Sequence, residues 1–181
     1  PATTDELVAF AKQVKATRPP GNYALAYEAG ASFYHAPWLH GFGGRLLDDR
    51  GRPALDSDGA IASAAFVESL AAAELLPPES TGVVAAQLFN DGRAALTING
   101  PWFVGEIAPG VPFGVAPLPT VSATGRPAAP LVEIEALLRP ARGHDAGAAT
   151  AFALWLAGGE AARIRATVGR QTVAAKAAWD D

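Results

Sequence analysis

The sequence contains no cysteine and no methionine, and no apolar stretch is long enough to cross a bilayer. The missing cysteines exclude disulfides and thiolate metal sites, and they fit an oxidising compartment and the cytosol equally well. Glu, Arg and Gly interrupt the alanine-rich stretches, which therefore do not predict a membrane span. A chain that begins at Pro1 and lacks methionine is expected to be a processed or excised segment without a signal peptide of its own.

Positive charge is also scarce. The 181 residues include 14 Lys and Arg against 18 Asp and Glu, which leaves a net charge of −4. A nucleic-acid-binding protein needs a basic face, so no nucleic-acid partner is expected. The hydrophobic residues, 50% of the chain, are enough for a core of ordinary domain size.

Helix and strand patterns alternate along the chain. Apolar residues at helical spacing predict helices over residues 4–15, 32–41, 58–73, 83–89, 101–107, 145–157 and 159–167. Short apolar runs predict strands over residues 23–26, 94–98, 113–116 and 131–137. This alternation favours an α/β fold with a mostly parallel sheet and helices on both faces.

A segment rich in Ser, Thr, Gly and Pro, residues 120–130, predicts a loop and a domain boundary. We therefore expect a ligand-binding lobe over residues 1–130. Residues 131–181 are expected to form a hinge-like strand followed by C-terminal helices that pack on it.

The segment from Phe89 to Trp102 is the most informative about function. Its turn, residues 90–92, tolerates the left-handed backbone at which a helix ends. Residues 94–98 form an apolar run typical of a buried parallel strand, and Asn-Gly-Pro at 99–101 ends it. Trp102 is thus expected just beyond the carboxyl end of a parallel strand, where open α/β sheets bind ligands.

The ordered set Phe-Asn-x-Gly, strand and Asn-Gly-Pro-Trp resembles the extracellular solute-binding proteins of carbohydrate ABC importers, most closely the maltose- and maltodextrin-binding members. Nearly the whole chain shares this resemblance, through residues 1–7, 33–44, 113–119 and 169–176. The family's N-terminal stretch and final helices have no counterpart, so mainly one lobe is represented.

The resemblance implies a type II periplasmic-binding-protein lobe. It also implies non-catalytic binding of a maltose- or maltodextrin-like oligosaccharide for uptake by an ABC transporter, in the periplasm or outside the cell. The implied partners are the sugar and the permease subunits, and either a second lobe or self-association would complete the site.

An interaction module is the alternative reading. The lobe would then be fused to a permease or dock on it, with little sugar binding of its own. A sugar titration followed by tryptophan fluorescence would separate the two readings.

Three aromatic residues are candidates for the apolar face of a sugar ring, whose hydroxyl rim suits planar polar groups. The resemblance implies that Trp102 stacks on a glucose ring, whereas spacing alone allows core packing equally well. Phe33 and Tyr34 are neighbours on a predicted helix and point about 100° apart. Tyr34 is favoured for the cleft because its hydroxyl can reach a sugar oxygen, while Phe33 fits the core as well as the cleft.

Glu133 and Glu135 lie two residues apart in the predicted strand 131–137, so both carboxylates are expected on one face. That face is either solvated or lines the cleft, where Glu133 would accept sugar hydroxyls. Paired carboxylates also occur in glycoside hydrolases, but no other feature supports hydrolysis, and no enzyme activity is expected.

No metal or cofactor is expected either, because His35, His40 and His144 lack metal-ligand spacing. Two departures from the family pattern weaken the case for tight maltose binding. Ala31 and Ser32 stand where the maltose binder has an acidic residue, and Gly82 stands near the place of a cleft tyrosine. A different oligosaccharide, or weak binding, stays open.

Overall fold

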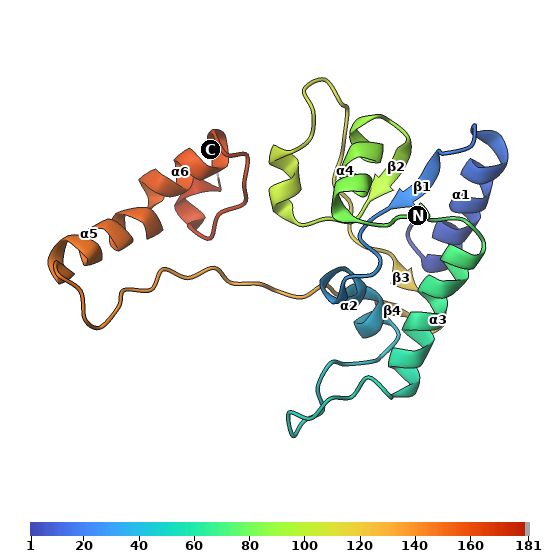
Figure 1. Cartoon of the computed structure of the whole chain (residues 1–181), viewed down its shortest axis with the longest axis horizontal. Helices are drawn as coiled ribbons and strands as arrows, with labels where there is room; N and C mark the ends of the chain where they lie inside the picture. The colour runs from blue at the N-terminus through green and yellow to red at the C-terminus, as the bar shows by residue number, and fades with distance from the viewer. Residues whose placement is uncertain (180–181) are drawn as a thin grey trace. The chain divides into compact units, whose positions relative to one another are not determined.

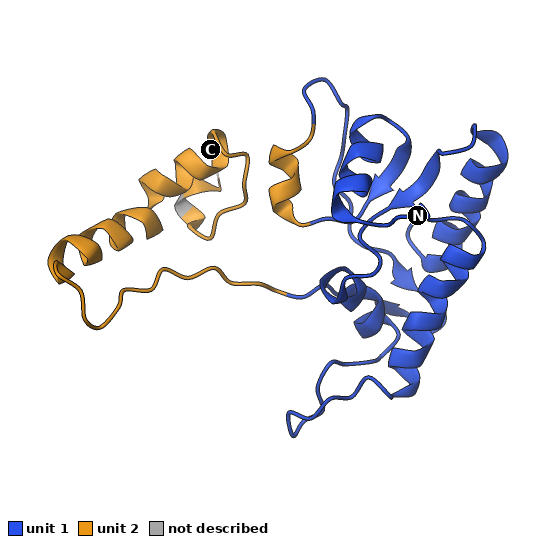
Figure 2. Cartoon of the chain, in the orientation of Figure 1, with its two compact units in different colours: residues 1–99, 108–131 blue, residues 100–107, 132–181 orange. Residues whose placement is uncertain are grey.

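The computed structural model describes residues 1–179 and divides into two compact units (Figures 1 and 2). Unit 1 consists of Pro1–Asn99 and Ala108–Leu131. Unit 2 consists of Gly100–Ile107 and the chain from Val132 onward. In residues 1–179, no helix combines the length and the apolar character needed to cross a bilayer.

A parallel pair of strands lies at the centre of unit 1. β1 (Tyr23–Ala26) pairs with β2 (Ala94–Thr97), so that Leu25 lies opposite Leu96. Three of the four β1 residues are buried, as expected for a strand covered on both faces. These pairings confirm two of the four predicted strands and the mixed α/β class, although the sheet is small.

The helices α1 (Thr4–Thr17) and α4 (Gly82–Asn90) pack on this pair, while α2 (Ser32–Gly41) and α3 (Asp58–Ala72) pack against each other. All four lie where helical spacing predicted them. Thr3 and Thr81 begin α1 and α4 by accepting hydrogen bonds from the backbone N–H groups of Glu6 and Val84. The main core cluster of buried residues consists of Leu7, Ala11, Ala24, Leu25, Tyr27, Trp38, Leu70, Leu75, Leu76 and Ala128.

The loop predicted over residues 120–130 contains a short antiparallel hairpin. β3 (Thr120–Val121) pairs with β4 (Arg126–Pro127), and Gly125 takes a φ of +68° in the turn. The Thr124 hydroxyl donates to the Gly41 carbonyl at 2.6 Å, and Val121 is fully buried against Gly41. The turn-forming residues therefore close a hairpin that packs against the end of α2.

The prediction of a strand over residues 113–116 is wrong. These residues have no strand or helix assignment, and Phe113 and Val115 are 41% and 87% exposed. A strand requires a hydrogen-bonded neighbour, and an apolar run between glycines and prolines does not supply one.

Unit 2 is helical. It contains η1 (Pro101–Gly105), α5 (Ala146–Ala157), α6 (Gly159–Thr167) and η2 (Lys176–Ala178). η1 is a 3₁₀ helix that begins at Pro101, so the predicted helix over 101–107 is shorter and more tightly wound. α5 contains no buried residue, and its Phe152 and Trp155 rings stack at 6.1 Å.

The hinge-like strand predicted over residues 131–137 is also wrong. Residues 131–140 are exposed and have no strand assignment, and within residues 1–179 no strand pairs with them. Period two therefore no longer places Glu133 and Glu135 on one face. The pattern of alternating carboxylates and apolar residues fits a strand, but no strand of residues 1–179 pairs with it.

A contact between α2 and α3 predicts a pH-dependent stability. His35 Nε2 lies 3.0 Å from Ser63 Oγ, and the fully buried Ser63 hydroxyl itself donates to the Ala60 carbonyl at 2.7 Å. The hydroxyl therefore accepts from Nε2–H. Burial lowers the pKa of His35 below its ordinary value of 6.5, because the charged ring is desolvated.

Since the pKa of His35 is lower in the folded chain than in the unfolded chain, the unfolded chain binds a proton first as the pH falls. Stability is expected to be highest above pH about 6.5 and to fall as the pH drops through the folded pKa. Urea unfolding at pH 7.5 and pH 5.0 should show this loss in the wild type and in His144→Gln, whose residue is exposed. A pH difference that persists undiminished in His35→Gln would contradict this assignment.

Candidate functional site

Unit 1 collects polar residues where β1 and β2 end. Glu28 follows β1 by two residues, and Asn99 follows β2 by two residues. The strands are parallel, so their carboxyl ends meet at one edge, the edge at which open α/β sheets bind ligands. The short turn after β1 leads directly into α2, which carries the predicted aromatic pair at its start.

The predicted residues Phe33 and Tyr34 lie together in the first turn of α2. Their rings make an edge-to-face contact at 5.3 Å, and both side chains are half-buried. The Tyr34 hydroxyl donates to Asn99 Oδ1 at 3.1 Å, while its ring packs against the main core cluster. Tyr34 thus has its ring in the core and its hydroxyl at the sheet edge.

Asn99 and Glu28 were not predicted as site residues. Asn99 was interpreted only as a strand-ending turn residue, although a polar side chain directly after a buried parallel strand is itself a signal. The Glu28 carboxylate lies against Gly82, the first residue of α4: a Cβ at position 82 would stand 2.9 Å from Glu28 Oε2. Nothing in the sequence indicates this approach, because 54 positions separate the two residues (82 − 28 = 54).

Trp102 belongs to unit 2 and lies in the first turn of η1. Its indole folds back over Gly100, where any Cβ would overlap the six-membered ring. The neighbouring Phe103 is buried and its N–H donates to the Gly100 carbonyl at 3.0 Å. Trp102 remains 39% exposed, so this turn presents a large aromatic surface in a defined orientation.

The predicted residue Glu133 also lies in unit 2, within the exposed segment that follows Leu131. The structure therefore brings Phe33 and Tyr34 together within unit 1, and it places Trp102 and Glu133 in the other unit. Each unit contributes its own candidate residues, and the roles of all four stay predictions.

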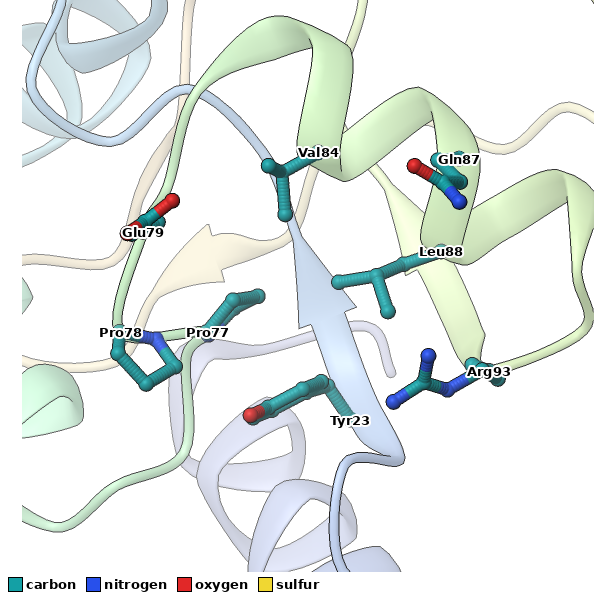
Figure 3. Close-up of a pocket in the computed structure, with 8 residues that line it drawn as sticks. All are labelled: Tyr23, Pro77, Pro78, Glu79, Val84, Gln87, Leu88 and Arg93. Carbon is teal, nitrogen blue, oxygen red and sulfur yellow. The ribbon is translucent and has the colours of Figure 1, made fainter.

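A shallow pocket of about 370 Å³ lies at the opposite end of the strands (Figure 3). Tyr23, the first residue of β1, and Arg93, just before β2, line it together with Leu88 of α4. The Arg93 Nε–H donates to the Gly21 carbonyl at 3.1 Å. Because it lies at the amino ends of the strands, this pocket is separate from the edge that carries Tyr34 and Asn99.

The side chains at the carboxyl edge comprise a phenol, an amide and a carboxylate. Such groups suit a neutral ligand with many hydroxyls, since they supply both donors and acceptors. Over residues 1–179, no group of three or more His, Cys, Asp or Glu side chains is arranged to hold a metal ion.

Comparison with known proteins identifies a family, a curated relative and a solved structure to which the chain is similar. Residues 1–180 match the family model described as bacterial extracellular solute-binding protein. A maltotriose-binding protein from Pyrococcus abyssi is 30% identical over 138 residues, which are 74% of this chain and 30% of that protein. The chain thus spans less than a third of the length of this curated relative.

The third match is a solved structure, described as the maltose/maltodextrin-binding domain MalE from Bdellovibrio bacteriovorus bound to maltotriose. Its TM-score is 0.87 at 24% sequence identity, over all of this chain and 50% of that one. At this identity the likeness shows the fold, and it confirms the predicted periplasmic-binding-protein lobe. Since the family model extends over residues 1–180, the chain belongs to the bacterial extracellular solute-binding proteins.

Proposed function

We propose that this chain binds a maltose- or maltodextrin-like oligosaccharide without chemical conversion and serves sugar uptake by an ABC importer. The observation that carries the proposal is the exposed Trp102 ring, held over Gly100 in the first turn of η1. An indole face covers the C–H face of a pyranose ring. The names of the two relatives, which specify maltotriose, support an α-glucan as the ligand class.

The polar edge of unit 1 supports the same ligand class. A phenol oxygen that donates to Asn99 can also accept a hydrogen bond from a sugar hydroxyl. Phe33 adds an apolar ring beside it. In this proposal Tyr34 and Phe33 of unit 1 contact the sugar. Within unit 2, Glu133 stays a predicted acceptor for sugar hydroxyls.

The cellular role follows from the family. Extracellular solute-binding proteins deliver their ligand to a transporter, so we propose permease subunits as partners and a periplasmic or extracellular location. The chain covers half of the solved structure that it resembles. We therefore propose that a further lobe, from elsewhere in a longer protein or from a second copy, supplies the other wall of the site.

The role of Trp102 is tested by Trp102→Ala. Loss of the stacking surface should remove roughly 1.5–3 kcal/mol of binding free energy for maltotriose, the scale for burying a large apolar side chain. Thermal melting and an NMR titration of the same samples separate binding from folding. Trp179→Ala, which removes another exposed tryptophan of unit 2 and lies outside α5, is the matched control and should leave binding unchanged. Collapse of stability with unaltered affinity of the folded fraction would show that Trp102 is a core residue.

The isolated chain should bind maltotriose only weakly, near millimolar. Sugar sites cover most of the surface of their ligand, and this chain supplies part of that cover. A loss of about 4.1 kcal/mol is enough to turn micromolar into millimolar affinity. Calorimetry on the 181-residue chain measures this directly, and micromolar binding by a monomer would show that the site is complete within it.

The isolated chain should also self-associate through α5. The helix contains no buried residue, and Phe152, Leu154 and Trp155 are all exposed. Exposed apolar patches of this kind favour association. Light scattering over a concentration series should show oligomers in the wild type and fewer in Phe152→Ser and Leu154→Ser. A chain that stays monomeric at every concentration would contradict this expectation.

A further inference from the structure

Glu28 is a carboxylate at the carboxyl edge of the strands, and its side chain lies against Gly82, the first residue of α4. Its backbone carbonyl accepts from the Ala31 N–H at 3.2 Å and so closes the turn between β1 and α2. The side chain is half-buried. Among the described residues, no hydrogen bond or ion pair joins its carboxylate to another group.

Gly82 gives this carboxylate its space. A Cβ at position 82 would stand 2.9 Å from Glu28 Oε2 and 3.8 Å from Cδ, a contact at which the side chain must shift. The backbone of Gly82 is helical, so its conformation does not require glycine. Alanine would favour the helix more than glycine does. The lack of a side chain at position 82 therefore leaves the Glu28 carboxylate the space that it occupies.

We propose that Glu28 is a further ligand-binding residue, which accepts hydrogen bonds from two neighbouring hydroxyls of one sugar unit, and that Gly82 keeps it in place. This inference rests on the proposed function of the chain. An ionised carboxylate has two acceptor oxygens and no donor, which matches a pair of adjacent hydroxyl groups. Glu28 follows β1 as Asn99 follows β2, so both side chains belong to the same sheet edge.

The charge of Glu28 also restricts the ligand. A carboxylate at the edge attracts hydroxyl donors and repels an anionic sugar such as a uronate. The ligand class is therefore a neutral oligosaccharide with adjacent free hydroxyls. An amino sugar would instead pair its ammonium group with the carboxylate. Titrations with each sugar distinguish this ligand class from the neutral oligosaccharides.

The test is an NMR titration of the full chain with maltotriose, a maltotriose uronate and chitosan trimer, alongside thermal melting. Glu28→Gln removes the charge and one acceptor and should weaken maltotriose binding about tenfold or more. Gly82→Ala should weaken binding without lowering the melting temperature, because the substitution favours the helix. Glu79→Gln, an exposed acid that lines the pocket in Figure 3, is the control and should change nothing.

The outcomes separate the two proposals. A wild-type chain without any response to maltotriose overturns the proposed function and this inference with it. If the wild type and Glu28→Gln bind maltotriose equally, Glu28 is not a ligand residue and the proposed function stands. Tighter binding of the chitosan trimer than of maltotriose overturns the neutral ligand class. When Gly82→Ala is added to Glu28→Gln, the affinity for maltotriose should fall no further. A further fall in the affinity of this double variant would show that Gly82 does not act through Glu28.

Discussion

The contact between Trp38 and Tyr27 determines where the candidate site of unit 1 lies. Trp38 Nε1 donates to the Tyr27 hydroxyl at 3.1 Å, and both side chains are fully buried. Burial raises the pKa of Tyr27 to about 12, because the ionised phenolate is desolvated. Tyr27 directly follows β1 and Trp38 lies in α2, so this bond holds the helix at the carboxyl end of the strand. The start of α2, with Phe33 and Tyr34, therefore comes to the edge beside Asn99.

The far end of α2 is held by residues distant in sequence. The β3–β4 hairpin packs Val121 against Gly41, and the His40 Nδ1 lies 2.7 Å from the Ala129 carbonyl. Phe66 of α3 packs against the Trp38 ring at a centroid distance of 5.3 Å. The helix is therefore held at its end and along its side, and its first turn is left to carry the aromatic pair. The core contacts of α2 thus position Phe33 and Tyr34, whose own side chains are only half-buried.

The sequence predicted those elements whose signal is local, and it missed those that need a partner. The helices have periodicity and capping residues such as Thr3, and β1 and β2 are short apolar runs between clear breaks. Residues 113–116 and 131–137 show similar strand patterns, but no neighbouring strand pairs with them in the described chain. The site follows the same division. Tyr34 was predicted from its residue type, whereas its partner Asn99 and the approach of Glu28 to Gly82 depend on chain segments that meet only after folding.

The Asn-Gly-Pro-Trp motif at residues 99–102 contributes side chains to both units. Its first residue, Asn99, bonds to Tyr34 within unit 1, and the following three belong to unit 2. Gly100 is needed because the Trp102 ring lies on it, and Pro101 suits the first position of η1 because it needs no N–H partner there. Four consecutive residues thus supply a polar group to one unit and an aromatic surface to the other. A side chain at position 100 would overlap the Trp102 ring, so the orientation of this aromatic surface depends on the glycine that precedes it by two residues.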